Sequence, residues 1–158
     1  MKTIQLTNSN QVALVDDEDY DYLNQWTWRT NASGYACRKT TNKQRKCITF
    51  FMHRVIMAIV DPTINIDHIN DNKLDNQRSN LRCATRSQNT GNQRKLTKAS
   101  SKYKGVSVYT KTHKWQAQIN CNKQHYYLGL FATEIEAARA YNKKAVELFG
   151  AFARLNEL

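Results

Sequence analysis

The sequence predicts an α+β protein made of two small modules, and three observations lead to this prediction. Short runs of β-branched and aromatic residues alternate with turn-forming residues along the first 50 positions. Residues 64–89 are dense in Asn and Asp and end in a T-x-x-Q pattern, which predicts the start of a helix. Residues 103–156 repeat the strand pattern three times and then become amphipathic with a helical period. At 158 residues, the chain has room for compact modules but not for one large enzyme core.

The composition is strongly basic, with 24 Lys and Arg against 13 Asp and Glu and a net charge of +11. Such a balance favours a polyanionic partner, either nucleic acid or an anionic membrane surface. The longest apolar run, residues 55–60, is too short to span a bilayer, and no signal peptide is recognisable. We therefore expect a soluble cytoplasmic protein that binds nucleic acid. The cysteines Cys37, Cys47, Cys83 and Cys121 form no C-x-x-C pair and are expected to be reduced thiols.

The charge and composition also predict the domain organisation. Residues 1–61 carry 8 basic and 6 acidic side chains, residues 62–99 carry 7 and 3, and residues 100–158 carry 9 and 4. The segment "TGNQRKLTKASSKYKG" is polar and lacks apolar periodicity, which indicates a linker. We place the first domain at residues 1–92, the linker at 93–101 and the second domain at 102–158.

The first 49 residues read as a β-rich scaffold. Strands are expected in "VALV", "WTWRT", "YACRKT" and "CITFF", with a short acidic helix in "DDEDYDYLNQ" and a second helix in "FFMHRVIMAIV", residues 50–60. Trp26 and Trp28 share one face of a strand, so they form either a buried stripe or a base-stacking platform; burial is the commoner outcome. His53, in the second helix, is either a packing or orienting histidine or a metal ligand.

The polar segment at residues 64–89 holds the residues with the clearest chemistry. Asp67 and His68 follow an alternating "INID", which predicts the end of a strand, and "LRCA" can be the returning strand. Thr85 and Gln88 predict a capping box, so a helix should start near residue 86 with Asn89 in its first turn. A carboxylate and an amide oxygen suit Mg²⁺ or a similar divalent ion. His68 points to the opposite strand face from Asp67 and is available to take a proton from water.

The pattern "DHIND…LDNQRSNLRCATRSQN", preceded by "MHR", resembles the HNH endonuclease family, specifically the phage and intron-associated homing type whose last His is replaced by Asn. The resemblance covers residues 50–92 and implies a ββα-metal motif. It further implies that His68 is the general base, that Asp67 and Asn89 hold one Mg²⁺ or Mn²⁺ ion, and that Asn80 pins the loop. The basic Arg82 and Arg86 are candidates to clamp phosphates. The alternative is a polar loop whose Asn and Asp residues only cap turns.

The last module is predicted to be a three-stranded sheet packed on one helix. The strands are "GVSVY", "WQAQINC" and "HYYLGLF", and the helix "TEIEAARAYNKKAVELFG" has Thr133 and Glu136 as a capping box and Gly150 past its end. Ala137, Tyr141, Ala145 and Leu148 make its apolar stripe. The other sheet face should be exposed and polar. Strand alternation places on or beside it the side chains of Lys104, Ser107, Tyr109, Lys114, Gln116, Gln118, Asn120, Lys123, His125 and Tyr127.

The pieces "YKGV", "KWQAQI", "YLGLF", "TEIEAARAYNKKA" and "ARLN" resemble the APETALA-type, or ethylene-response-factor, DNA-binding domain. In that family the exposed sheet face enters the major groove. Here Lys104, Ser107, Tyr109 and Asn120 stand where arginines are common in plant members, so the plant target sequence does not transfer. The alternative reading of the sheet is a protein-interaction module.

Together these observations predict a DNA endonuclease that hydrolyses phosphodiester bonds with one metal ion and a histidine base, targeted by its C-terminal sheet. The alternative is a non-catalytic, sequence-specific DNA-binding regulator that kept the fold. We expect double-stranded DNA as the partner, no membrane or small-molecule partner, and a monomer.

Overall fold

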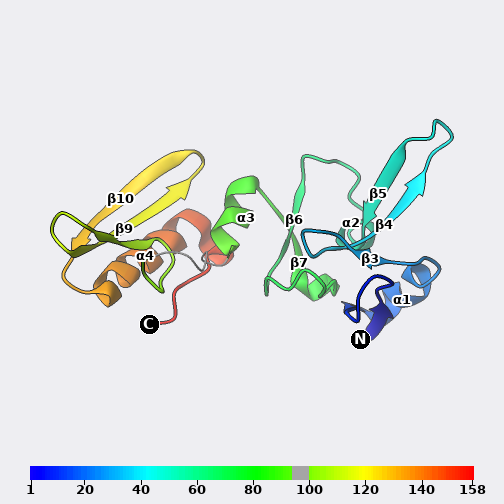
Figure 1. The fold of residues 1–158 in the computed structure, drawn as a ribbon, viewed down its shortest axis with the longest axis horizontal. Helices are drawn as coiled ribbons and strands as arrows, with labels where there is room; N and C mark the ends of the chain where they lie inside the picture. The colour runs from blue at the N-terminus through cyan, green and yellow to red at the C-terminus, as the bar shows by residue number, and fades with distance from the viewer. Residues whose placement is uncertain (94–99) are drawn as a thin grey trace. The chain divides into compact units, whose positions relative to one another are not determined.

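The computed structural model describes residues 1–93 and 100–158 (Figure 1). They form two compact units, Met1–Ala84 and Thr85–Leu158, and each is taken by itself below. Both units combine small antiparallel sheets with helices, so the predicted α+β class is confirmed. Most of the predicted linker at residues 93–101 lies outside the described residues. No helix in the described ranges is long and apolar enough to cross a membrane.

The first unit contains three small antiparallel sheets, β1–β2, β3–β4–β5 and β6–β7. Its elements in chain order are β1 (Lys2–Gln5), β2 (Val12–Val15), α1 (Asp17–Leu23), β3 (Arg29–Thr30), β4 (Ala36–Thr41), β5 (Cys47–Phe51), α2 (Met52–Ile56), β6 (Asn65–His68), the 3₁₀ turn η1 (Arg78–Asn80) and β7 (Leu81–Ala84). Strand β1 has no counterpart in the sequence prediction.

The core of the first unit forms around Trp28, which is completely buried with Leu6, Leu23 and Met52. The Trp28 indole Nε1–H donates to the Leu23 carbonyl at 2.8 Å, so the buried polar atom is satisfied. Trp28 is therefore a core residue and not a base-stacking platform. Trp26 is half-buried, with the Arg38 guanidinium 4.3 Å from its ring centroid.

The helix expected at residues 50–60 is much shorter in the structure, where α2 spans only Met52–Ile56. Ala58 adopts a left-handed backbone conformation with φ of 51°. The Ile59 N–H bonds the Arg54 carbonyl and the Ala58 N–H bonds the Val55 carbonyl, which is the Schellman pattern that ends a helix. Because glycine, the usual residue at this position, is absent, the sequence carried no stop signal.

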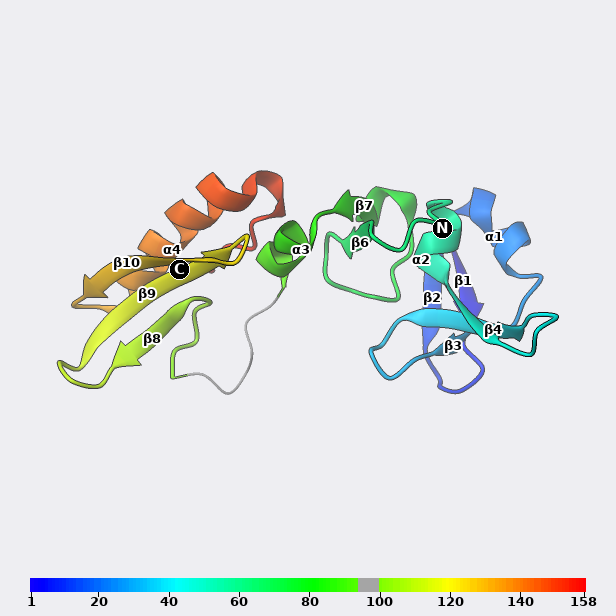
Figure 2. The same ribbon diagram turned by 90° about the horizontal axis from the view of Figure 1, so that it is seen from above.

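The second unit is a three-stranded antiparallel sheet covered on one face by a long helix (Figure 2). Its elements are α3 (Arg86–Asn92), β8 (Val106–Tyr109), β9 (Lys114–Cys121), β10 (Gln124–Phe131), α4 (Glu134–Phe149) and the 3₁₀ turn η2 (Gly150–Phe152), with strand order β10–β9–β8. The capping box of Thr133 and Glu136 is present, and α4 ends before Gly150, as predicted.

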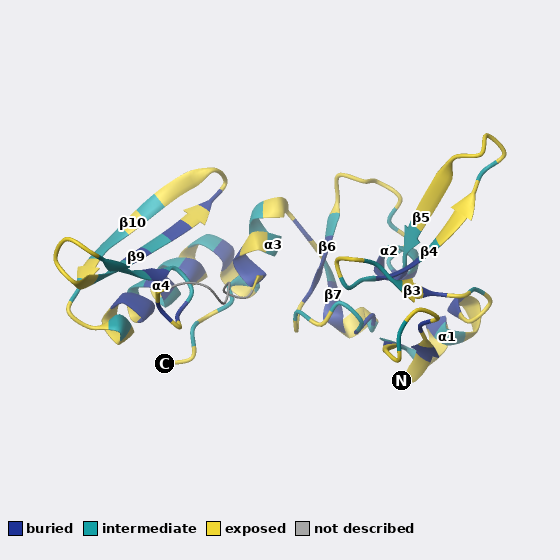
Figure 3. Cartoon of the chain, viewed as in Figure 1, coloured by how far each residue is buried: buried dark blue, intermediate teal, exposed yellow. Residues whose placement is uncertain are grey.

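Small side chains let α4 approach the sheet closely. Ala137, Ala145 and Tyr141 of the helix are buried with Ala117 and Ile119 of β9 (Figure 3). This stripe agrees with the predicted one except that Leu148 is only half-buried. The sheet's other face is left to carry polar groups.

Helix α3 packs within the second unit. A Cβ atom on Gly91 would lie 2.7 Å from Cγ of Phe149, so glycine is what allows this close contact. The Lys104 ammonium donates to the Gly91 carbonyl at 2.6 Å and to the Gln93 carbonyl at 2.7 Å, and it also reaches the Thr90 carbonyl at 3.3 Å. A cation at the helix C-terminus satisfies carbonyls that have no partner within the helix and complements the helix dipole.

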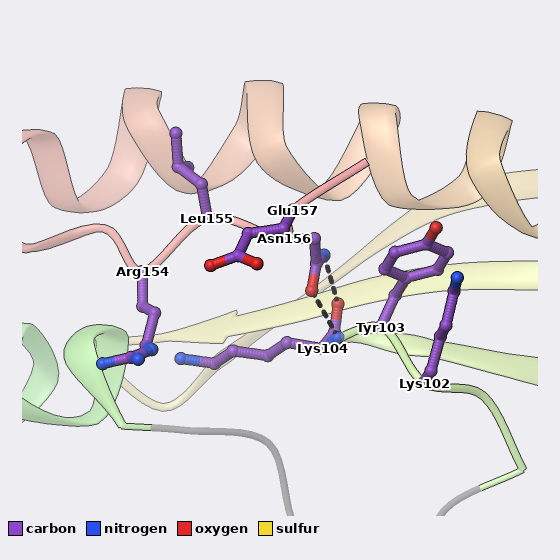
Figure 4. A pocket seen from close by; sticks show the side chains of 7 residues that line it. All are labelled: Lys102, Tyr103, Lys104, Arg154, Leu155, Asn156 and Glu157. Carbon is purple, nitrogen blue, oxygen red and sulfur yellow. Dashed lines mark hydrogen bonds between the residues drawn. The ribbon is translucent and has the colours of Figure 1, made fainter.

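The C-terminal segment that follows α4 is tied to the chain around Lys104 (Figure 4). The Asn156 side chain accepts from the Lys104 N–H at 2.6 Å and donates to the Lys104 carbonyl at 3.1 Å. Lys102, Arg154 and Glu157 line the hollow beside this pair. The backbone of Lys104 is thus fixed at the point from which its side chain reaches α3.

Candidate nuclease site and nucleic-acid interface

The candidate nuclease site is built on the hairpin of β6 and β7. In the register of this hairpin Asp67 faces Arg82 and His68 faces Leu81. Neighbouring residues on a strand point to opposite faces, so Asp67 and His68 present their side chains to different surroundings. Both are nearly fully buried, with exposed fractions of 4% and 5%.

The Asp67 carboxylate is paired with Arg82. Oδ2 of Asp67 accepts from Nε and from Nη2 of Arg82, each at 2.8 Å, and Arg82 is itself mostly buried. From the sequence, Arg82 is a candidate to clamp phosphate, whereas in this structure its guanidinium neutralises the carboxylate of Asp67. A phosphate contact by Arg82 would compete with that ion pair.

The ring of His68 packs against the rings of two other residues. Its ring centroid is 5.2 Å from that of His53 and 5.8 Å from that of Tyr35. Nε2 of His68 faces Oδ1 of the fully buried Asn76 at 3.5 Å. Burial lowers the pKa of His68, although Asn76 and the nearby Asp67 and Asp75 act in the opposite direction. The neutral ring, which can accept a proton, is therefore favoured near neutral pH.

His53, in α2, also packs in this cluster of rings. Its ring stacks on Phe51 at 5.6 Å, lies 5.2 Å from Tyr35 and is 7% exposed. Burial, reinforced by the fields of His68 and Arg54, lowers the pKa of His53 to about 3. The sequence left two roles open for His53, a packing or orienting histidine and a metal ligand, and these contacts are those of the first. Two other neighbours of His68, Tyr35 and Asn76, carry no recognisable signal in the sequence. Tyr35 is distant in sequence, and Asn76 is one of many asparagines in its segment.

Asn80 ties both ends of the loop between β6 and β7. Its Oδ1 accepts from the Asn70 N–H at 3.0 Å, and its Nδ2 donates to the Asp75 carbonyl at 2.8 Å and to the Asn70 side chain at 3.0 Å. Asn80 is buried, so each of these bonds replaces hydration that the side chain has lost. This set of bonds is what a loop-pinning residue requires.

Asn89, the second predicted metal ligand, lies in α3 of the second unit and is half-buried. The capping box of Thr85 and Gln88 starts this helix as predicted and puts Asn89 in its first turns. Arg86 is exposed at the first position of the helix. Across residues 1–93 and 100–158 no three His, Cys, Asp or Glu side chains gather in a group that could hold a metal. A buried carboxylate and an amide fit a hard divalent ion that keeps water and phosphate oxygens as its other ligands.

The exposed face of the second unit's sheet gathers the predicted DNA-contacting residues. Cross-strand pairs share a face, and the register joins Ser107 with Gln116, Tyr109 with Lys114, Gln118 with Tyr127, and Asn120 with His125. Oε1 of Gln118 accepts from Nε2 of Gln116 at 3.2 Å and lies 3.1 Å from Nε2 of His125. Lys104 is different, because its ammonium caps α3 and is not presented on the face.

Comparison with known proteins links these two sites to two families. The family described as HNH endonuclease matches residues 50–90. A mimivirus protein named "Uncharacterized HNH endonuclease L560" is 32% identical over 151 residues, which cover 92% of this chain and 75% of that protein.

The second similarity is to plant proteins. APETALA2-like protein 2 of rice is 41% identical over 73 residues, which cover 45% of this chain and 16% of the rice protein. The AP2-like ethylene-responsive transcription factor TOE2 of Arabidopsis is 47% identical over 58 residues, which cover 36% of this chain and 12% of that factor. These matches support an APETALA-type DNA-binding domain, although the chain spans only a small part of either plant protein.

Proposed function

Because the chain belongs to the HNH endonuclease family, we propose that it hydrolyses DNA phosphodiester bonds with His68 as general base and that its C-terminal sheet holds the duplex. The observation that carries the proposal is the buried Asp67–His68 pair on β6, in which a neutral histidine and a carboxylate face opposite sides of one strand.

His68 takes the proton from the attacking water. A general base must be unprotonated to do this, and burial favours that form of His68. Its ring packs against the rings of His53 and Tyr35, and Asn80 fixes the loop that follows. A base held in place in this way keeps its lone pair directed at one point, which is what proton abstraction from a positioned water needs.

Asp67 and Asn89 would hold one divalent ion, Mg²⁺ or Mn²⁺. The bound ion supplies Lewis-acid stabilisation of the charge that develops on the phosphate and on the leaving oxygen. The role of Arg82 follows from its ion pair with Asp67, since the guanidinium neutralises and orients the buried carboxylate.

The C-terminal sheet contributes target choice. Side-chain amides such as Gln116, Gln118 and Asn120 can pair with base edges in the major groove, and Lys114 can contact phosphate. In the alternative, a non-catalytic regulator, the same sheet would suffice. The buried histidine and carboxylate on β6 favour the nuclease, because a regulator has no need to bury them.

A plasmid nicking assay tests the proposal. The protein should nick or cut supercoiled plasmid with Mg²⁺ and stop when chelator is added. His68→Ala should lower the rate by roughly 10²–10⁴-fold, the usual contribution of a general base, and retain duplex binding. His113→Ala removes an exposed histidine from the turn before β9 and is the matched control, expected to cut at the wild-type rate. Cutting by His68→Ala at the wild-type rate would remove His68 from the mechanism. Duplex binding without cleavage in either metal would favour the regulator.

A further inference from the structure

The β4–β5 hairpin extends from the first unit as an exposed two-stranded ribbon (Figure 1). Every residue from 39 to 49 is exposed except the half-buried Asn42, and Figure 3 shows the ribbon almost entirely in the exposed colour. A two-stranded hairpin without a packed face is marginally stable in water, so its outer part adds little to the core. We propose that this ribbon is a second DNA-binding element, which enters the major groove of the duplex that the nuclease site cleaves.

The ribbon carries a concentrated positive charge. Arg38, Lys39, Lys43, Arg45 and Lys46 lie within it, and no Asp or Glu occurs between residues 22 and 60. All acidic residues before that point fall at positions 16–21, in or next to α1. The near-neutral sum over residues 1–61 therefore hides a basic ribbon and an acidic helix. A local concentration of Lys and Arg of this kind attracts DNA phosphates.

The tip of the ribbon has a defined shape. The Asn42 side chain accepts from the N–H groups of Gln44 and Lys46 at 3.0 and 2.9 Å, and the Asn42 N–H bonds the Lys46 carbonyl at 3.0 Å. Asn42 thus forms the inside of the five-residue turn, and the side chains of Lys43 and Arg45 are exposed. A turn fixed by its own asparagine presents these cations without further loss of backbone entropy on binding.

One face of the ribbon leads to the general base. Cross-strand pairs share a face, so Lys39 with Thr49 and Thr41 with Cys47 continue the face of Cys37 with Phe51. Phe51 stacks on His53, whose ring is edge-on to that of His68. A duplex lying on this face would have its backbone beside the nuclease motif. A major groove about 12 Å wide accepts a two-stranded ribbon.

The proposal rests on the proposed nuclease function for the identity of its ligand, but its test needs no cleavage. Binding of the full chain to a short DNA duplex is measured in chelator at several salt concentrations. Lys43→Ala combined with Arg45→Ala should reduce the slope of log K against log salt by about 2, since each phosphate that a cation neutralises contributes about 0.9. Lys143→Ala combined with Arg139→Ala removes the same charges at exposed positions on α4, the helix that covers the second unit's sheet on the side away from its polar face, and should leave the slope near wild type. All four positions are exposed, so both variants should fold.

Alkylation of Cys47 gives a second readout. Cys47 is exposed on the ribbon, whereas Cys37 and Cys121 are buried, and Cys83→Ser removes the other exposed thiol. Saturating duplex should slow the reaction of Cys47 with a maleimide at least tenfold. An unchanged salt slope in the ribbon variant together with an unprotected Cys47 would overturn the proposal, as would stronger protection by single-stranded RNA than by duplex. If the ribbon results hold while the plasmid stays uncut, the nuclease proposal alone fails.

Discussion

A drop from pH 7 to pH 5 should destabilise the first unit by about 2 kcal/mol through His53 alone. The pKa of His53 is lowered from 6.5 to about 3 in the folded chain, chiefly by burial. The unfolded chain therefore takes up the proton first, and stability is lost as the pH falls below 6.5 and continues to fall until about pH 3. A pH of 5 is 1.5 units below the pKa of the unfolded histidine, and each unit corresponds to about 1.36 kcal/mol.

His53→Phe should remove this part of the pH dependence. Phenylalanine keeps the stack on Phe51 and the packing against Tyr35 but cannot take up a proton. Nδ1 of His53 is buried and has no hydrogen-bond partner in the described ranges, so the substitution sacrifices no bond at that atom. A smaller pH dependence should remain, because burial also lowers the pKa of His68.

Urea unfolding followed by tryptophan fluorescence measures the effect. Trp26 and Trp28 lie in the first unit and Trp115 in the second, so a Trp115→Phe background restricts the signal to the first unit. Met52→Leu, a change at a buried neighbour that does not titrate, controls for general destabilisation. If His53→Phe loses as much stability between pH 7 and pH 5 as the wild type does, the assignment of this loss to His53 is refuted.

Two further predictions concern the metal and the target. Asp67→Ala should abolish cleavage, whereas the activity of Asn89→Ala should be partly rescued by higher Mg²⁺ or Mn²⁺, because a neutral ligand contributes less to metal binding than a carboxylate. Metal titrations of the nicking rate test this. Normal cutting by both variants in trace metal would exclude Asp67 and Asn89 as the metal ligands. Changing Gln118, Asn120 and Tyr127 to Ala should reduce sequence preference more than it lowers non-specific affinity. The loss of preference should be about 1–3 kcal/mol for each base-reading side chain that is removed. Binding to a randomised duplex pool measures this, and an unaltered preference would contradict the assignment of this sheet face to DNA.

The features that the sequence predicted well depend on short-range signals. The capping boxes at Thr85 and Thr133 need only residues three positions apart, and both helices begin where these boxes place them. Strand alternation likewise brought Gln116 and Gln118 to the exposed face of β9, opposite the buried Ala117.

The features that the sequence could not predict depend on distant contacts or on conformations without a residue signature. Tyr35 contacts His68 although the two are 33 positions apart in the sequence, and no local sequence pattern predicts this contact. Helix α2 ends at a left-handed alanine, Ala58, where a glycine would have been recognisable. Lys104 stands where family members have arginines, which predicts a DNA contact. In the structure its ammonium instead donates hydrogen bonds to three carbonyls in and just after α3.

The anchoring of α3 on the second unit has a consequence for exchanging modules between genes. A seven-residue helix is too short to persist alone, and this one depends on Lys104 and on the packing of Gly91 against Phe149. A fusion that begins the C-terminal module after residue 101 would separate the helix from both supports. A fusion that begins at Thr85 would keep them, and the last asparagine of the nuclease motif would then be inherited together with the sheet that we propose reads DNA.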